Sequence, residues 1–92
     1  MSPSSSQNIT AATTTTVKSG SGILRSIIFN KPVILGITTI YDNTAASGNK
    51  IGTITNPAAL LQQQMVVPYN VRFQTGLTIV TSTADDITVC FE

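Results

Sequence analysis

Side chains able to carry out acid–base chemistry are scarce in this chain of 92 residues. It has no histidine, and its four acids are Asp42, Asp85, Asp86 and Glu92. General acid–base catalysis needs a positioned histidine or a pair of carboxylates. Asp85 and Asp86 are adjacent, so in a strand they would face opposite sides, and in a turn such residues usually bind backbone amides. We therefore expect no catalytic pair and no enzymatic activity.

Metal and thiol chemistry is equally poorly supplied. Cys90 is the single cysteine, and it has no basic neighbour in sequence that would activate it, so we interpret it as a buried structural thiol. One thiol and no imidazole are too few ligands for a zinc cluster. Asp42 and Asn43 offer oxygen ligands, but the spacing of a calcium loop does not follow them. We expect no metal and no cofactor.

Carbohydrate recognition has one candidate cluster, because it needs an exposed aromatic or carboxamide group. Tyr41, Asn43 and Asn49 lie in or beside the small, polar segment 42–49, which we interpret as a loop. The other aromatic residues fall mostly on the expected inward faces of strands, where they serve as core. A glycan-binding domain is therefore the second functional hypothesis.

Charge and hydropathy limit the classes of partner that the chain can bind. Only 10% of the residues are charged and the net charge is +1, against about 25% charged residues in ordinary soluble domains. The five cations are scattered along the chain, which predicts no nucleic-acid partner. No apolar run approaches the about 20 residues that span a bilayer. The first 22 residues lack a signal-peptide pattern, and together with the lone cysteine this predicts synthesis in a reducing cytoplasm.

The first 22 residues differ from the rest, since eleven of them are Ser or Thr. Such a composition buries too little apolar surface to fold alone. We expect residues 1–22 to form an extended arm in front of a folded domain over 23–92. The residues expected to bind a partner are Ile9, Thr13, Thr14, Thr15, Thr16 and Val17, and those expected to form a hinge are Gly20 and Gly22. A chain lacking 1–19 should then fold normally. The alternative is that this segment packs on its own domain.

Period-two alternation after residue 22 predicts an all-β domain. The expected strands cover 23–29, 33–42, 50–55, 65–74, 77–81 and 87–91. Six to eight short strands with turns every eight to twelve residues are typical of a β-sandwich or a jelly-roll-like barrel. Pro68 places segment 65–74 at a sheet edge or at a bend between two short strands, and the spacing of Ile51 and Ile54 predicts a bulge near Gly52. Residues 56–57 resemble a helix start, so 58–64 form one or two helical turns or an irregular loop.

The inward faces of these strands define a candidate core. Its members are Ile27, Phe29, Ile37, Tyr69, Val71, Phe73, Ile79, Ile87, Val89 and Phe91. Segment 33–42 is apolar on both faces, which favours a central strand or one covered by a partner. A domain of about seventy residues without disulfide or metal is marginal alone. We therefore expect it to associate with itself or with a larger surface.

Three runs of residues carry a family resemblance: VKSGSGIL at 17–24, TIYDNTAASG at 39–48 and PYNVRFQTGLTIV at 68–80. They resemble small structural proteins of tailed bacteriophages, namely capsid decoration (cement) proteins. The resemblance covers roughly 17–92 and implies a trimer-forming β-fold on the outside of an icosahedral head. Its partners would be further copies of itself and the major capsid protein. The role of residues 1–16 is inferred from composition alone.

Two functional hypotheses follow. The first is a capsid decoration protein that stabilises the outer surface of a phage head, located on the virion after synthesis in the host cytoplasm. The second is a phage fibre or adhesin-like domain that recognises a host glycan through Tyr41, Asn43 and Asn49. The second hypothesis needs an exposed aromatic or carboxamide cluster, and glycan-array binding by the isolated protein would favour it.

Overall fold

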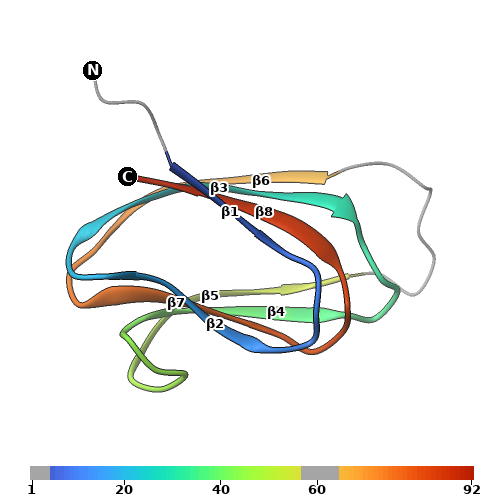
Figure 1. Cartoon of the computed structure of the whole chain (residues 1–92), viewed down its shortest axis with the longest axis horizontal. Coiled ribbons are helices and arrows are strands. Elements are labelled where there is room, and N and C mark those ends of the chain that lie inside the picture. The colour runs from blue at the N-terminus through green and yellow to red at the C-terminus, as the bar shows by residue number, and fades with distance from the viewer. Residues whose placement is uncertain (1–4, 57–64) are drawn as a thin grey trace.

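Two antiparallel four-stranded sheets face each other in the computed structural model, which describes residues 5–56 and 65–92 (Figure 1). In spatial order, the first sheet consists of β1 (Ser5–Ile9), β8 (Asp86–Phe91), β3 (Gly22–Lys31) and β6 (Met65–Phe73). The second sheet consists of β2 (Thr14–Ser19), β7 (Gly76–Thr81), β4 (Ile37–Asp42) and β5 (Asn49–Thr55). The prediction of an all-β sandwich is confirmed.

The core lies between the two sheets, where alternate side chains of facing strands meet. The buried apolar residues are Ile9, Leu24, Ile27, Phe29, Ile40, Phe73, Leu77, Ile79, Ile87 and Val89. Six of them were predicted, and Tyr69 and Phe91 are partly buried against this cluster. The prediction is wrong for Ile37 and Val71, which are 42% and 36% exposed. Ile37 points away from the core at the start of β4, and Val71 lies on the edge strand β6.

Bulges explain where simple alternation fails. The pairing of β3 with β6 shifts between Leu24 and Ser26, and on the opposite strand Asn70 has a φ of 53°. A bulge reverses the order of inward and outward side chains, so Leu24 is buried together with Ile27, although the two are an odd number of positions apart. The predicted bulge near Gly52 is confirmed.

The N-terminal segment belongs to the sandwich and is not a separate arm. All five residues of β1 pair with β8, and β2 pairs with β7. Ile9 belongs to the buried core and is 4% exposed, and Val17 packs against this core cluster. Backbone bonds of a sheet need no particular side chains, which is why a bland Ser/Thr-rich sequence can form two edge strands. The domain boundary expected after residue 22 is therefore wrong.

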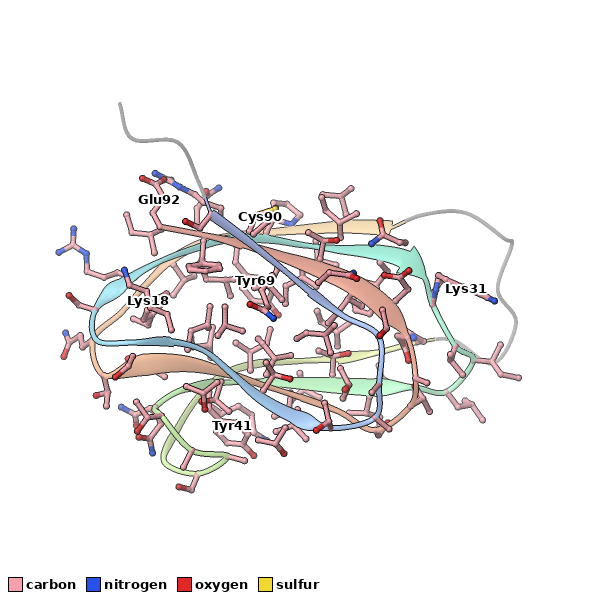
Figure 2. All side chains as sticks on the ribbon, in the orientation of Figure 1. Lys18, Lys31, Tyr41, Tyr69, Cys90 and Glu92 are labelled. Carbon is pink, nitrogen blue, oxygen red and sulfur yellow. The ribbon has the colours of Figure 1, made fainter. Side chains whose placement is uncertain are left out.

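Three further expectations concern single segments. The strand predicted over 33–42 begins only at Ile37, because 33–36 forms a turn in which the Gly36 N–H donates to the Val33 carbonyl (3.1 Å). Its central position is confirmed, since β4 lies between β7 and β5. Cys90 lies on the outer face of its sheet and is partly exposed, so the expected buried thiol is wrong (Figure 2). The helix or loop expected over 58–64 lies outside the described residues.

Candidate interaction surface

Exposed apolar side chains gather at one end of the molecule, in the connection from β3 to β4 and at the first residue of β4. Ile34 is 53% exposed, Leu35 61% and Ile37 42%. We call these three residues the apolar tip. The connection follows Lys31, at the end of the sandwich opposite to Lys18 and Glu92 (Figure 2). Large apolar side chains that gather on a surface mark interaction sites more often than single ones do.

Leu35 adopts a backbone conformation that is unfavourable for its side chain. Its φ is 59°, in the left-handed region where a Cβ atom comes too close to the backbone. The conformation costs roughly 1–2 kcal/mol for an L-residue, and glycine or asparagine usually occupies such a position. Leu35 thus combines backbone strain with an apolar side chain left in water, and neither feature stabilises the isolated chain.

Partly buried hydrogen bonds fix the base of this turn. The Val33 N–H donates to Asp85 Oδ2 (3.2 Å), and Asn56 Nδ2 donates to the Val33 carbonyl oxygen (2.8 Å). The Asn56 N–H donates to the Gly36 carbonyl oxygen (2.8 Å). Gly36 packs so closely on Thr83 and Asp85 that a Cβ atom there would overlap the Thr83 hydroxyl and crowd the Asp85 carboxylate. The strained conformation is therefore imposed by the surrounding structure, as expected for strain kept at functional sites.

Asp85 is the centre of this base. It is 1% exposed, and its carboxylate accepts hydrogen bonds from Asn56 Nδ2 (2.8 Å), the Thr83 hydroxyl and the Val33 N–H. A buried carboxylate needs such donors, since an unpaired one would be strongly destabilising. The expectation that Asp85 binds a backbone amide is confirmed, although the amide belongs to a different loop. Asp86 instead accepts from the side-chain amides of Asn8 and Asn30.

The residues predicted to bind a partner through an arm are occupied within the chain. Ile9 is in the core, and Thr14 and Thr15 pair with β7. The Thr13 N–H donates to the Thr81 hydroxyl (3.1 Å), and the Thr16 hydroxyl donates to the Thr44 carbonyl oxygen (3.2 Å). Val17 packs on the core. As apolar anchors for a partner, Ile9 and Val17 are wrong, because their burial already stabilises this domain.

The two glycines of the predicted hinge have different roles. Gly20 has a φ of 96° in the turn from β2 to β3, and its N–H donates to the Thr75 carbonyl oxygen (2.9 Å). Gly22 is the first residue of β3, where a Cβ atom would overlap the Glu92 carbonyl oxygen and the Phe73 ring. Close packing is the reason for glycine at this position, and a hinge there is wrong.

The candidate glycan residues lie at the other end of the sandwich. Asn43 Nδ2 donates to the Ser47 carbonyl oxygen (2.8 Å), and its Oδ1 accepts from the Thr44 N–H (2.8 Å). The Asn43 carboxamide therefore holds its own loop together. Tyr41 is half-buried and Asn49 is exposed. The structure thus leaves only two of the three side chains open to a sugar.

Asp42, beside this loop, ties it to the turn between β6 and β7. Its carboxylate accepts from the N–H groups of Thr75 (2.9 Å), Gln74 (3.0 Å) and Gly76 (3.4 Å). The Thr75 N–H holds the pKa of Asp42 below its ordinary value of 3.8; partial desolvation opposes this effect, and the other two amides add to it. This arrangement is a structural clamp for two loops.

Other features of the described residues offer less. A shallow depression of about 330 Å³ is lined by Ser21, Gly22, Ile23, Arg72 and Gln74. Within 5–56 and 65–92, no cluster of three or more His, Cys, Asp or Glu side chains could hold a metal ion. No helix in that part of the chain is long and apolar enough to span a membrane. The apolar tip is therefore the most distinctive surface.

Comparisons with known proteins add no relative: no family model, no curated protein and no solved structure matches the chain. The candidate site rests on the geometry alone. Sequence analysis missed the tip because Ile34 and Leu35 fit a strand that is apolar on both faces. The signal that could have revealed it is Pro32 directly before the four-residue turn 33–36, together with Gly36 at its end.

Proposed function

We propose that this protein is a non-enzymatic structural component of a virion, a capsid decoration protein that binds and stabilises the outer surface of a phage head. The observation that carries the proposal is the apolar tip, a rigid and strained surface that is unfavourable for the isolated chain. Strain and exposed apolar area together indicate a site whose stabilising contacts come from another molecule.

The tip would insert Leu35 and Ile34 into an apolar pocket of the major capsid protein. Its base is already fixed by Asp85 and Asn56, so little conformational freedom is lost on binding, which favours affinity. Single contacts of this size are weak, but repetition over a shell, and assembly of copies into trimers, makes them strong.

The strand order also supports the proposal. Strands β1, β3, β6 and β8 form one sheet, and β2, β4, β5 and β7 form the other, so the chain crosses between the sheets after β1, β2, β3, β5, β6 and β7. We take this order, β1-β8-β3-β6 against β2-β7-β4-β5, to be that of a jelly roll. Eight-stranded jelly rolls are common in viral capsid domains.

The experiment uses purified heads of the parent phage from which the chain has been removed. Full-length protein is added back, and binding is measured by co-sedimentation and by cryo-electron microscopy. Leu35→Asn should weaken binding at least about tenfold, equivalent to 1.4 kcal/mol, while Val66→Thr should not. Val66 is a matched control because it is also 61% exposed but lies on β6. Absence of the chain from purified particles would contradict the proposal.

A further inference from the structure

The four edge strands of the sandwich are not equally protected. An exposed sheet edge presents unpaired N–H and C=O groups that can add a further strand, and proteins block such edges with proline, bulges and charges. Strands β6, β2 and β5 each carry such devices. Strand β1 carries none of them, and this contrast is the basis of the inference.

The edge of β6 is blocked by Pro68, which has no N–H to donate, and by the register shift opposite Asn70. The edge of β2 is interrupted by a register shift between Thr16 and Lys18. The edge of β5 has a register shift as well, together with the exposed Lys50. None of the three offers an unbroken template.

The edge of β1 is continuous. Ser5–Ile9 pairs with β8 without any shift in register, and the strand contains no proline, glycine or charged residue. The side chains from Ser5 to Asn8 are all exposed. The one protective feature is its short length, which limits the strength of any added pairing but does not prevent it.

We infer that β1 is a strand-addition site for β1 of a second copy of this chain, in antiparallel orientation about a two-fold axis. The register that pairs all five residues places Gln7 opposite Gln7 of the other copy. Such an interface uses the same patch on both copies and joins two four-stranded sheets into one continuous antiparallel sheet of eight strands.

Side-chain chemistry favours a second copy as the occupant. A glutamine carboxamide both donates and accepts, so it complements an identical group. No charged side chain lies on β1, and the row of Ser6, Cys90, Ser26 and Pro68 across the outer face of the sheet is also uncharged. Two copies therefore approach each other without bringing like charges together at this edge.

Asp86 is the nearest acid to this edge. Its carboxylate accepts hydrogen bonds from Asn8 Nδ2 (2.7 Å) and Asn30 Nδ2 (3.3 Å), so it is already bonded to the amides of its own chain. The pairing of β1 is independent of the proposed capsid contact, because the apolar tip lies in the connection from β3 to β4 and at the start of β4, and not on β1. A three-fold contact between copies would use other surfaces, since a two-fold interface engages β1 only once in each copy.

Cross-linking tests the register. In a Cys90→Ser background, the full chain with Gln7→Cys would place two thiols across an antiparallel pair at a Cα distance of about 4.5–5.5 Å, which a disulfide can bridge. Mild oxidation should yield covalent dimer at least about tenfold faster than Thr53→Cys on β5, a difference equivalent to 1.4 kcal/mol. Equal rates for the two variants would overturn the inference.

Self-association provides a second, independent measurement. Light scattering at protein concentrations up to about 1 mM, where weak complexes are populated, should show a rising mass for the natural chain. Gln7→Lys should abolish the rise, because like charges directly opposite each other are destabilising, whereas the matched Gln74→Lys should not. A constant monomer mass, or an equal effect of both lysines, would overturn the pairing. An intermolecular disulfide between Ser6→Cys and Cys90 would show exchanged β1 strands and would also overturn it.

Discussion

Asn56 and Asp85 form a buried hydrogen bond, with Asn56 Nδ2 lying 2.8 Å from Asp85 Oδ2. Asn56 directly follows β5, Asp85 directly precedes β8, and the two residues are 29 positions apart in sequence. Each also bonds to Val33, at its carbonyl oxygen and its N–H respectively. This three-way junction connects the end of β5, the loop before β8 and the turn that carries the apolar tip. The position of the tip therefore depends on strands from both sheets.

Removing the Asn56 side chain should destabilise the protein. Asn56→Ala leaves the Asp85 carboxylate without one of its donors in a buried setting, and an orphaned buried polar group costs about 1–3 kcal/mol. Chemical denaturation should show this loss, while the exposed Asn49→Ala should change the free energy of unfolding by less than about 0.5 kcal/mol. Equal stability of both variants would mean that the junction does not hold the turn.

Leu35→Asn should keep or increase stability while it removes binding. Asparagine tolerates a positive φ better than leucine and places no apolar surface in water, so the free energy of unfolding should rise by up to about 1 kcal/mol. Thermal melting measures the stability, and co-sedimentation with heads measures the binding. A variant that loses stability would show that Leu35 supports the fold and is not kept for a partner.

Asp42 should make stability depend on pH in the acid range. Because the pKa of Asp42 in the folded state lies below its ordinary value of 3.8, its contribution to stability is complete above that ordinary value, which applies to the unfolded chain. The contribution is lost as the pH falls through the folded pKa. Asp42→Asn, which keeps one acceptor oxygen, should be less stable than the natural chain at pH 7 and should approach it below the folded pKa. Urea titrations at several pH values measure this difference, and a constant difference would contradict the clamp.

Deletion of residues 1–19 should unfold the domain, in contrast to the expectation from sequence. The deletion removes β1 and β2, and with them the buried Ile9 and the packed Val17. A small domain has a net stability of only about 5–15 kcal/mol. We expect the stabilisation lost with two strands to exceed this value. Circular dichroism should show a loss of cooperative melting. Normal cooperative melting of the chain that lacks 1–19 would instead support the expectation that residues 1–22 form a separate arm.

Gly22→Ala should be destabilising by about 1–3 kcal/mol, since the added methyl group overlaps the Glu92 backbone and the Phe73 ring. Gly20→Ala meets no atom within 4 Å but must keep a φ of 96°, at a cost of roughly 1–2 kcal/mol. Ser21→Ala, between them and exposed, is the control. Unchanged stability of Gly22→Ala would support a hinge there after all.

Local patterns were sufficient for much of the fold. Alternation over 65–74 and 87–91 predicted strands with Phe73, Ile87 and Val89 inside, because the side-chain period of a strand is two and does not depend on its neighbours. Pro68 predicted a sheet edge or a bend, of which the edge is the one observed, and the interrupted spacing near Gly52 predicted a bulge. These features follow from the backbone chemistry of single residues and adjacent positions.

Only the tertiary structure decided which strands are neighbours. Ser5 pairs with Phe91, almost the whole chain away, and a Ser/Thr-rich segment does not reveal its partner because backbone bonds, not side chains, hold it. The strain at Leu35 likewise cannot be read from the local sequence. Asp85 and Asn56, which come from distant loops, impose a left-handed backbone conformation on this leucine. The sequence determined strands such as β8 and their inward faces, whereas long-range pairing determined the strands of the Ser/Thr-rich segment, the sheet edges and the tip that is exposed to partners.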